Sequence, residues 1–302
     1  MNTLPLVISP EVRTALAERR PVVALESTLI THGFAWPRNL EVARRIEQSV
    51  RDAGAVPATI AILKGQPMIG LDDAQLDMLG TTKGARKCSL RDLGIAIGLK
   101  QDGATTVAAT MLLAQMAGLH VFATGGIGGV HRGHPFDVSN DLEALARIPI
   151  TVVCAGAKAL LDLPLTFEHL ETRGVPVIGY ETDEVPAFYS RRSGIAADVR
   201  ANSAADVAAI VRARRALGQE GGELVCAPVP AADELPADVA ELAIREAQRL
   251  ADERGVHGAA STPFLLAQIA ELTGGAAVRA NMSLLVNNAA VGAAIAAALL
   301  ES

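Results

Sequence analysis

The chain has 302 residues, of which 50% are hydrophobic, 20% are charged and only 3% are aromatic, and its formal net charge is −6. A negative charge and few aromatic rings argue against a main role in binding a nucleic-acid polymer, which needs a basic surface and stacking side chains. The length and the apolar content are typical of a chain that buries one large core. We therefore predict a single α/β domain over residues 1–302.

Three features bear on the cellular compartment. The cysteines Cys88, Cys154 and Cys226 lack the spacing of a disulfide framework or a zinc site, so we expect a reducing, cytoplasmic compartment. Residues 1–20 carry charges instead of a signal-peptide core and predict a short helical lead-in. The apolar run at 289–300 is shorter than the roughly 20 residues of a membrane span, so we expect a buried helix and no membrane partner.

Apolar runs alternate along the chain with amphipathic stretches. Strands are predicted at 22–25, 58–63, just before Thr124, just before Ala155, at 175–179 and at 224–227, with helices near 40–53, 72–79, 91–100, 105–117 and 139–147. This alternation predicts a layered α/β/α fold with a mostly parallel central sheet. The last third predicts a helical C-terminal region, in which Thr262 caps a helix that begins at Pro263 and ends at Gly274 and Gly275.

The first of these strands ends in Glu26, Ser27 and Thr28. A carboxyl group at the mouth of a dry site can have its pKa raised enough to act as a general acid. The other interpretation is that Glu26 is an ordinary ion-pair partner while Ser27 and Thr28 cap the following turn. The position alone favours neither.

A glycine-rich segment, residues 124–133, follows the next predicted strand and ends in His131, Arg132 and Gly133. Its backbone N–H groups can converge on an anion, and Arg132 can grip the same phosphate or carboxylate. A dinucleotide-binding loop is disfavoured, because the third glycine of its motif is replaced by His131. A tight strand-to-helix turn without a ligand is the structural alternative.

Lys158 follows a third strand and a run of small residues. Such surroundings desolvate the amine and lower a lysine pKa, which activates lysines that form imines. A solvated lysine, or one paired with Asp162 a helical turn later, is the alternative.

Two further pairs of polar residues have the spacing of one or two helical turns. Asp137 and Asp141 offer hard oxygen ligands that suit Mg²⁺ or Mn²⁺, with helix capping by Asp137 or Ser139 as the alternative. Asn281 and Asn288 lie seven residues apart and so share one helix face. Amides on an apolar helix need hydrogen-bond partners. The structural alternative to a site role is that these two amides cap or cross-link neighbouring helices.

Six blocks of the sequence together resemble the pseudouridine-5′-phosphate glycosidase family, which includes proteins formerly called indigoidine synthase A. The resemblance runs in order from Pro21 to the C-terminal helix. The blocks span 25–33, 55–61, 103–107, 124–133, 154–158 and 261–266.

The resemblance implies an enzyme of the hydro-lyase class that reversibly cleaves the C–C glycosidic bond of pseudouridine 5′-phosphate to give uracil and ribose 5-phosphate. It also implies an α/β/α homotrimer with one Mn²⁺ per subunit, for which Mg²⁺ or another divalent ion can substitute. By position, Lys158 matches the nucleophile, Glu26 the proton donor and Asp137 the metal ligand. The positions that match substrate contacts are Lys87, Val107, Thr124, His131, Arg132, Ser139, Asn140, Asp141 and Asn281. One departure is that only Gly-His-Pro separates Arg132 from Phe136, where relatives carry a longer insert.

This chemistry predicts a mechanism. Glu26 protonates the ring oxygen while Lys158 attacks C1′, uracil leaves as a carbanion, and water, organised by a metal near Asp137, hydrolyses the remaining imine. Two other functions use the same residues. An aldolase-like lyase would form an imine with a small aldose phosphate, and a sugar-phosphate sensor would only bind charge through Lys158 and Arg132.

Overall fold

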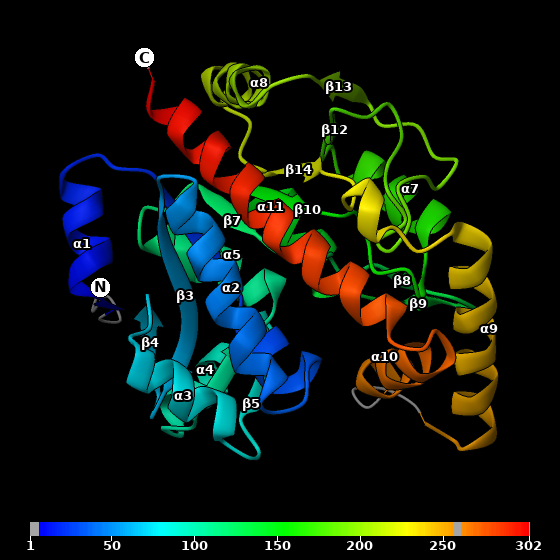
Figure 1. The fold of residues 1–302 in the computed structure, drawn as a ribbon. Coiled ribbons are helices and arrows are strands. Elements are labelled where there is room, and N and C mark those ends of the chain that lie inside the picture. The colour runs from blue at the N-terminus through cyan, green and yellow to red at the C-terminus, as the bar shows by residue number, and fades with distance from the viewer. Residues whose placement is uncertain (1–5, 257–260, 302) are drawn as a thin grey trace.

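The computed structural model describes residues 6–256 and 261–301, and its core is one large sheet between layers of helices (Figure 1). The strands are β1 Val7–Ile8, β2 Val22–Leu25, β3 Val56–Leu63, β4 Gln66–Ile69, β5 Arg86–Cys88, β6 Gly103–Thr105, β7 Val121–Ala123, β8 Val130–His131, β9 His134–Val138, β10 Thr151–Cys154, β11 Leu161–Asp162, β12 Val177–Tyr180, β13 Val199–Ala201 and β14 Glu223–Cys226. The helices are α1 Pro10–Ala17, α2 Arg38–Asp52, α3 Asp73–Thr81, α4 Leu90–Gly98, α5 Val107–Met116, α6 Asn140–Arg147, α7 Leu163–Thr172, α8 Ala204–Ala216, α9 Ala237–Glu253, α10 Ser261–Leu272 and α11 Ala276–Leu300.

The main path of the sheet has the order β1-β4-β3-β2-β7-β10-β14-β12-β13. Its centre, from β3 to β13, is parallel, while β4 and β6 pair antiparallel with β3. A parallel sheet covered on both faces needs continuous apolar strands, and β2, β3, β7, β10 and β14 are buried throughout. The predicted α/β class and its mostly parallel sheet are confirmed.

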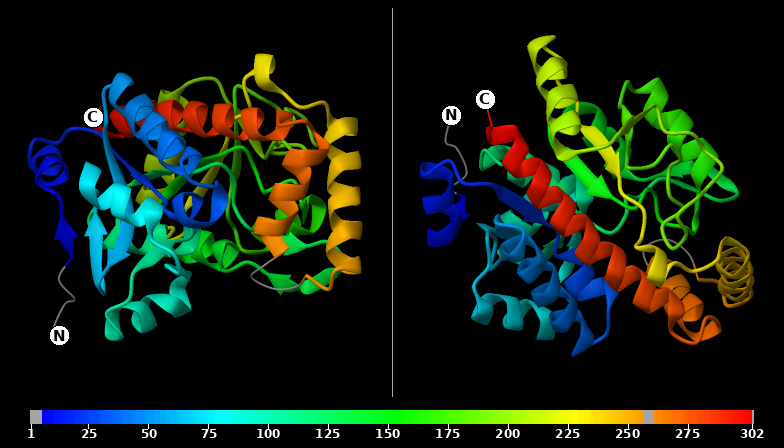
Figure 2. Two further views of the ribbon diagram at one scale, coloured as in Figure 1. Left: turned by 60° about the horizontal axis from the view of Figure 1, so that its bottom comes forward. Right: turned by 45° about the horizontal axis from the view of Figure 1, so that its top comes forward.

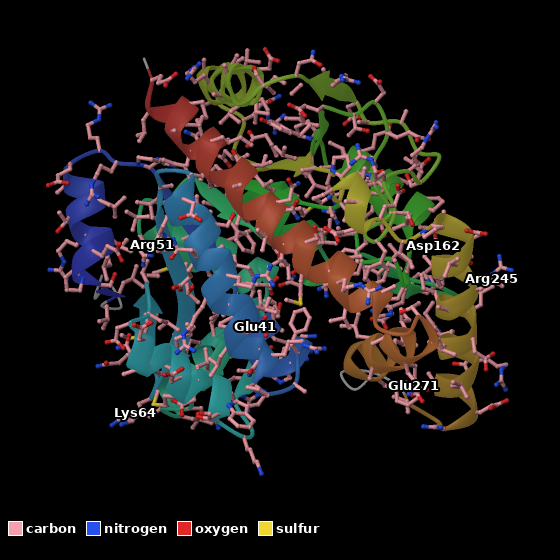
Figure 3. The ribbon with its side chains drawn as sticks, in the orientation of Figure 1. Glu41, Arg51, Lys64, Asp162, Arg245 and Glu271 are labelled. Atoms are coloured by element: carbon pink, nitrogen blue, oxygen red, sulfur yellow. The ribbon has the colours of Figure 1, made fainter. Side chains whose placement is uncertain are left out.

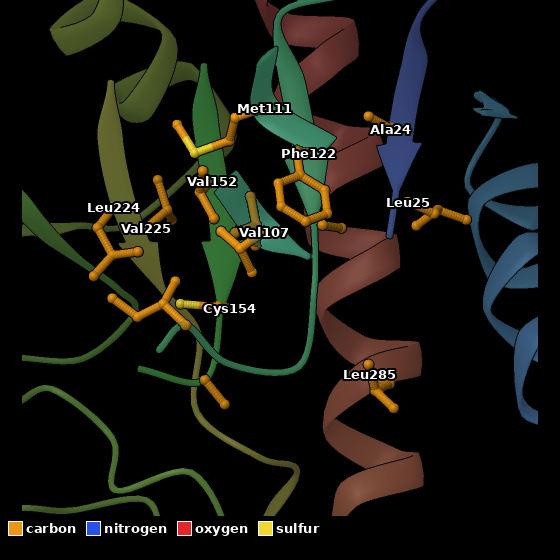
Figure 4. Close-up of a cluster of buried hydrophobic side chains, with 14 of the residues drawn as sticks. Ala24, Leu25, Val107, Met111, Phe122, Val152, Cys154, Leu224, Val225 and Leu285 are labelled. Atoms are coloured by element: carbon orange, nitrogen blue, oxygen red, sulfur yellow. The ribbon is translucent and has the colours of Figure 1, made fainter. Parts of the chain in front are cut away.

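One face of the sheet is crossed by α11, which lies between α2 and α8, and α5 lies on the other face (Figures 1 and 2). Gly292 lets α11 approach β7 closely, since a Cβ there would lie 3.2 Å from that of Ala123. The Ser49 hydroxyl of α2 donates to the Val286 carbonyl of α11 at 2.8 Å. Side chains from β2, β7, β10 and α11, among them Leu25, Phe122 and Leu285, form the core between these layers (Figure 4).

The length expected for the C-terminal helix was wrong. The apolar run at 289–300 is only the end of α11, which has 25 residues and mean hydropathy 1.8 in its most apolar window, so it is long enough to span a bilayer. The segment with Asn281 and Asn288, which was also expected to be helical, is continuous with this run in α11. Half of that window is buried inside the protein, where α11 packs on β7 and β10, as expected of a core helix.

Other boundaries moved by smaller amounts. Helix α10 begins at Ser261, so Thr262 lies inside the helix and does not precede it. The predicted stop is confirmed, since α10 ends at Leu272 and Gly275 adopts a φ of +80° just before α11. A strand, β1, precedes the predicted N-terminal helix, and a small separate sheet of order β11-β8-β9 was not foreseen.

Candidate active site

Three adjacent parallel strands bring the predicted catalytic residues to one edge of the sheet. Strand order places β7 between β2 and β10, and Leu25 is in register with Ala123, which in turn is in register with Val153. Glu26 and Thr124 therefore follow their strands at the same level. Lys158 lies four residues beyond the end of β10, in a loop whose Lys158 N–H donates to the Ile127 carbonyl at 3.1 Å.

Glu26 is buried, with 8% of its surface exposed, and its carboxylate accepts a hydrogen bond from the Thr124 hydroxyl. Burial raises the pKa of Glu26, although the positive charge of Lys158 and the Thr124 hydrogen bond both act in the opposite direction. Glu26 makes no ion pair with any residue that the structure describes. The ion-pair interpretation is therefore not realised, and the protonated carboxyl that a general acid needs is favoured.

The hydroxyls next to Glu26 cross-link the sheet. Ser27 donates to the Ile60 carbonyl, and Thr28 donates to the Thr105 carbonyl, both at 2.7 Å. The alternative interpretation, in which Ser27 and Thr28 cap the following turn, is therefore wrong. These two bonds fix the backbone on which Glu26 is carried.

Lys158 is partly buried, and within residues 6–256 and 261–301 it has no salt-bridge partner. Asp162, the partner considered from the sequence, instead caps α7 by accepting a hydrogen bond from the Leu165 N–H at 3.1 Å. The charges of Glu26 and Lys87 lie close enough to Lys158 to act on it electrostatically. An amine without a fixed partner, beside a buried acid, is suited to nucleophilic attack.

Five of the predicted residues line one cavity of about 70 Å³, which we call the inner pocket: Glu26, Lys87, Thr124, Lys158 and Asn281. Lys87 enters from β5 at the rim, where partial burial, followed by the charge of Lys158, lowers the pKa of its ammonium group. Asn281 enters from α11. The inner pocket adjoins a cavity of about 820 Å³, the outer chamber, and both are lined by His32, Gly33, Phe34, Leu266 and Asn281.

The glycine-rich segment binds an anion of the protein itself. The Gly128 N–H donates to the Asp141 carboxylate at 2.8 Å, and the Ile127 N–H donates to the Gly156 carbonyl at 3.1 Å. Glycine is required at 128 for close approach, because a Cβ there would lie 2.3 Å from the Ser139 hydroxyl oxygen. These two N–H groups are thus occupied by the protein itself. The segment leads from β7 into β8, so it is not the strand-to-helix turn of the structural alternative either.

Four predicted residues lie beneath the pocket and are not part of its lining. The second oxygen of Asp141 accepts from the Ala108 N–H at 3.0 Å, at the start of α5, where Val107 is the first helical residue and is buried. Ser139 caps α6, as the alternative for this region predicted. Asn140 accepts a hydrogen bond of 3.4 Å from Ser89. This group ties α5 and α6 to the glycine-rich segment.

His131, Arg132 and Asp137 line a different cavity of about 580 Å³, which we call the hairpin chamber, next to the β8–β9 hairpin. The guanidinium of Arg132 is engaged by the protein. It donates to the Leu161 and Ala159 carbonyls at 3.0 Å and to both oxygens of Glu241, on α9, at 3.0 and 3.1 Å. In this arrangement it does not face the inner pocket.

Asp137 is exposed on β9 and makes no hydrogen bond or ion pair among the described residues. Mg²⁺ and Mn²⁺ can be held by one carboxylate with water completing the shell, so Asp137 alone fits a hydrated divalent ion. In the described part of the chain, no group of three or more His, Cys, Asp or Glu side chains is placed to hold a metal. Asp141 differs from Asp137 in that both its oxygens are taken by backbone N–H groups.

His32 and Phe188 are among the residues of the inner pocket that were missed from the sequence. His32 lies in a π-helical turn, Leu29–Gly33, closed by a 3.2 Å hydrogen bond from the Phe34 N–H to the Leu29 carbonyl. Its membership of the block at 25–33 was the available signal. Phe188 is buried with a φ of +63° and packs against Gly126, where a Cβ would lie 2.7 Å from its ring. No pattern in the sequence indicated Phe188.

The two asparagines on α11 have different roles. Asn281 lines both cavities. Asn288 is fully buried and donates to the Thr124 carbonyl at 2.8 Å. Asn288 therefore links α11 to the end of β7 and not to a neighbouring helix, and it fixes the residue that hydrogen-bonds to Glu26.

Comparison with known proteins gives consistent matches over nearly the whole chain. A family model described as indigoidine synthase A like protein matches residues 11–298. Pseudouridine-5′-phosphate glycosidases of Solibacter usitatus and Caldanaerobacter subterraneus subsp. tengcongensis are 53% and 52% identical to the chain, over 96% and 97% of it and 98% and 96% of their own lengths.

Two solved structures share the fold. The prealnumycin C-glycosynthase AlnA, in complex with ribulose 5-phosphate, is 42% identical with a TM-score of 0.91 and covers 99% of this chain and 98% of its own. An indigoidine synthase A-like protein from Thermotoga maritima is 34% identical with a TM-score of 0.90, over 98% and 97% of the two chains.

Proposed function

This chain belongs to the indigoidine synthase A-like family, and from that premise we propose that it is a pseudouridine-5′-phosphate glycosidase, which reversibly cleaves the substrate to uracil and ribose 5-phosphate. The observation that carries the proposal is the inner pocket. There, a buried carboxyl group that favours its protonated form follows β2, and a lysine without a salt-bridge partner in the described chain lies in the loop after β10, on the other side of β7.

The bond to be broken explains why both groups are needed. Uracil is attached to ribose through carbon, so no leaving heteroatom can be protonated, and the two-carboxylate route of ordinary glycosidases is insufficient. The neutral Lys158 amine attacks C1′ as the C1′–O4′ bond breaks, and Glu26 gives its proton to O4′. The product is an open-chain ribose 5-phosphate joined to both uracil and Lys158.

Attack leaves a positive charge on the Lys158 nitrogen, which in the second step first passes a proton to the Glu26 carboxylate. Its lone pair then forms a C=N bond as the C1′–C5 bond breaks. The electron pair of that bond passes to uracil, which then takes up a proton at C5. Water adds to the iminium carbon and releases ribose 5-phosphate and the free lysine. Because water is eliminated in the direction of synthesis, we assign the enzyme to the hydro-lyases.

The remaining lining residues bind and orient the substrate. Lys87 brings positive charge to the rim and suits the sugar phosphate, and Asn281 offers both a donor and an acceptor. Thr124 holds the Glu26 carboxyl through its hydroxyl. Binding energy from the phosphate would then align C1′ with Lys158.

The test is uracil release from pseudouridine 5′-phosphate by the purified protein, together with formation of pseudouridine 5′-phosphate from uracil and ribose 5-phosphate. Both directions should proceed. Folded protein that gives neither, with or without Mn²⁺, would overturn the proposal and favour an aldolase-like lyase or a sugar-phosphate sensor.

We further propose that a divalent ion, Mn²⁺ or Mg²⁺, binds at Asp137, with one ion per subunit. The exposed carboxylate supports this proposal, and water molecules would fill the rest of the coordination shell. A bound ion would supply positive charge for phosphate oxygens and water. Mn²⁺ binding, followed by electron paramagnetic resonance, should be lost in Asp137→Asn.

We also propose that the chain acts as a single domain within a cytoplasmic homotrimer. Phe136 is 99% exposed on the β8–β9 hairpin, and Trp36 is 67% exposed beside the outer chamber, which supports burial against other subunits. The buried free cysteines Cys88, Cys154 and Cys226 suit a reducing compartment. Light scattering should give three times the chain mass, and Phe136→Glu should reduce it.

A further inference from the structure

His32 stands at the boundary between the two cavities of the site. It lines the inner pocket, which holds Glu26, Lys87 and Lys158, and it also lines the outer chamber, to which none of those three contributes. It is presented by the π-helical turn Leu29–Gly33, a form of backbone that is rare and is frequently found at functional sites.

The imidazole of His32 is oriented by its neighbour. Its Nδ1 lies 2.5 Å from the Thr31 hydroxyl oxygen. When that hydroxyl donates to Nδ1, the ring proton is on Nε2, which has no other hydrogen-bond partner among the described residues. Burial and then the charge of Lys87 lower the pKa of His32, so the ring is neutral at neutral pH and can donate without carrying a charge.

The two cavities suit different parts of the substrate. C1′ must reach Lys158 and the phosphate suits Lys87 at the rim, so C1′ belongs in the inner pocket of about 70 Å³ and the phosphate at its edge. The outer chamber is lined by aromatic and apolar side chains, including Phe34, Trp36 and Tyr189, and is large enough for a planar base. A base that extends from C1′ into the outer chamber passes His32.

We propose that His32 binds the leaving nucleobase and donates a hydrogen bond from Nε2 to the base carbonyl oxygen on which negative charge develops. This role depends on the proposed function. As the C1′–C5 bond breaks, its electron pair spreads over C5 and the adjacent carbonyl oxygen, while the lysine nitrogen forms the C=N bond. His32 keeps its proton throughout and lowers the barrier as a preorganised donor does for an oxyanion.

The assignment predicts which steps need His32. Formation of the imine between ribose 5-phosphate and Lys158 involves no base, so it should not depend on His32. Loss or addition of uracil does involve the base and should depend on it. A merely structural histidine would affect both, because the π-helical turn follows directly after Glu26.

The first experiment compares His32→Leu, which removes the donor, with His32→Gln, which keeps an N–H donor. His32→Leu should lower kcat for uracil release by about 10²-fold with little change in KM, and His32→Gln should recover part of that loss. Borohydride trapping of ribose 5-phosphate on Lys158 should stay within about twofold of the parent in both variants. His120→Gln, at the opposite end of β7, is the matched control and should retain full activity.

The second experiment changes the carbon nucleophile in the direction of synthesis. Barbituric acid forms its carbanion more readily than uracil and needs less stabilisation from the protein. If the parent accepts it, the loss in His32→Leu should be several-fold smaller with barbituric acid than with uracil.

The outcomes distinguish a failure of the proposed function from a failure of the role proposed for His32. A parent protein that releases no uracil overturns the proposed function and the role of His32 with it. An active parent with an unimpaired His32→Leu variant, or a variant that loses trapping and turnover in parallel, overturns only the role of His32.

Discussion

The inner pocket and the hairpin chamber contain residues from the same stretch of sequence, but they are built by different means. Thr124 follows β7 directly, and its position beside Glu26 is set by the register of parallel strands. Arg132 and Asp137, a few residues later, are carried by the β8–β9 hairpin, where Phe136 is almost fully exposed. One region is fixed by the sheet, whereas the other projects from it.

The difference extends to how the polar groups are satisfied. In the inner pocket, Glu26 and Lys158 lack ion-pair partners in the described chain, so their chemistry is available to a substrate. In the hairpin chamber, Arg132 has its donors occupied by Glu241 and two carbonyls, while Asp137 has no partner among the described residues. The comparison indicates that the groups of the inner pocket are available to a substrate, whereas Asp137 is available to a further component, such as an ion or a neighbouring subunit.

The largest expected effect is at Lys158. Lys158→Ala should lower turnover by about 10⁴-fold or more, because no other group on the pathway can form the imine. Substrate binding, measured by calorimetry, should remain. Lys83→Ala, an exposed lysine without an ion pair among the described residues, is the control and should be fully active. Substantial activity in Lys158→Ala would contradict the assignment of the pocket as the catalytic region.

Substitution of Glu26 should lower activity strongly but raise the stability of the folded protein. Glu26→Gln should lower kcat by about 10²- to 10³-fold, since the proton for the ring oxygen is lost. The pKa of Glu26 is higher in the folded protein than in the unfolded chain. As the pH rises above the unfolded-state pKa, ionisation therefore favours the unfolded chain and the parent loses stability. Glu26→Gln should therefore be more stable than the parent at pH 8, and the difference should vanish below pH 4.

A matched glutamate sharpens this result. Burial raises the pKa of Glu223 as it does that of Glu26, but Glu223 also pairs with the largely buried Arg214 at 3.1 Å and accepts a hydrogen bond from Thr151, so its loss leaves a buried guanidinium without its partner. Glu223→Gln breaks that pair and should lower the free energy of unfolding at neutral pH by roughly 1–3 kcal/mol. If the two variants changed stability in the same direction, Glu26 would be an ordinary structural carboxylate.

Thr124 tests how the acid is tuned. Its hydroxyl stabilises the ionised form of Glu26, so Thr124→Val should raise the pKa of that carboxyl further. The alkaline limb of the pH–rate profile should move to higher pH, with kcat at the optimum reduced about tenfold or less. Thr59→Val removes a similar hydrogen bond, to Glu47 outside the pocket, and should leave the profile unchanged. A limb that moved to lower pH would exclude Glu26 as its origin.

The smallest effect on activity is expected at Arg132. Arg132→Ala should lower the free energy of unfolding by about 1–3 kcal/mol, because it leaves two carbonyls without their donor and the half-buried Glu241 with only Arg245. KM should change by less than about threefold if the guanidinium stays with Glu241 when substrate binds. Arg245→Ala removes the exposed second partner of Glu241, on α9 (Figure 3), and should cost under about 0.5 kcal/mol. A large rise in KM with unchanged stability would instead place Arg132 on the substrate.

The sequence predicted best what depends on strand ends. The apolar runs before Glu26, Thr124 and Lys158 predicted three strands of a parallel sheet, and parallel strands present their carboxyl ends together. The resemblance then supplied roles for these residues. Lys87 and Asn281, which only the resemblance assigned to the substrate, also line the pocket, although no pattern in the sequence placed β5 or α11 beside these strand ends.

Side-chain partners were not predictable in the same way. Nothing local indicates that Arg132 meets Glu241, which lies 109 residues later on α9, or that Asp141 turns its carboxylate to Gly128 and Ala108. These contacts depend on how layers dock. The conformation of Phe188, with its positive φ, depends likewise on the loop that contains Gly156.

Helix α11 follows every other helix and strand in the chain, yet it provides Asn281 to the pocket and, through Asn288, the hydrogen bond that holds the Thr124 carbonyl. During synthesis on the ribosome, the sheet and its strand-end residues emerge long before this helix does. A nascent chain would therefore carry Lys158 and Glu26 before the helix that holds Thr124 beside Glu26 is in place. Reactivity toward sugar phosphates should arise only after α11 has left the exit tunnel, which would spare unfinished chains from forming imines with cellular sugars.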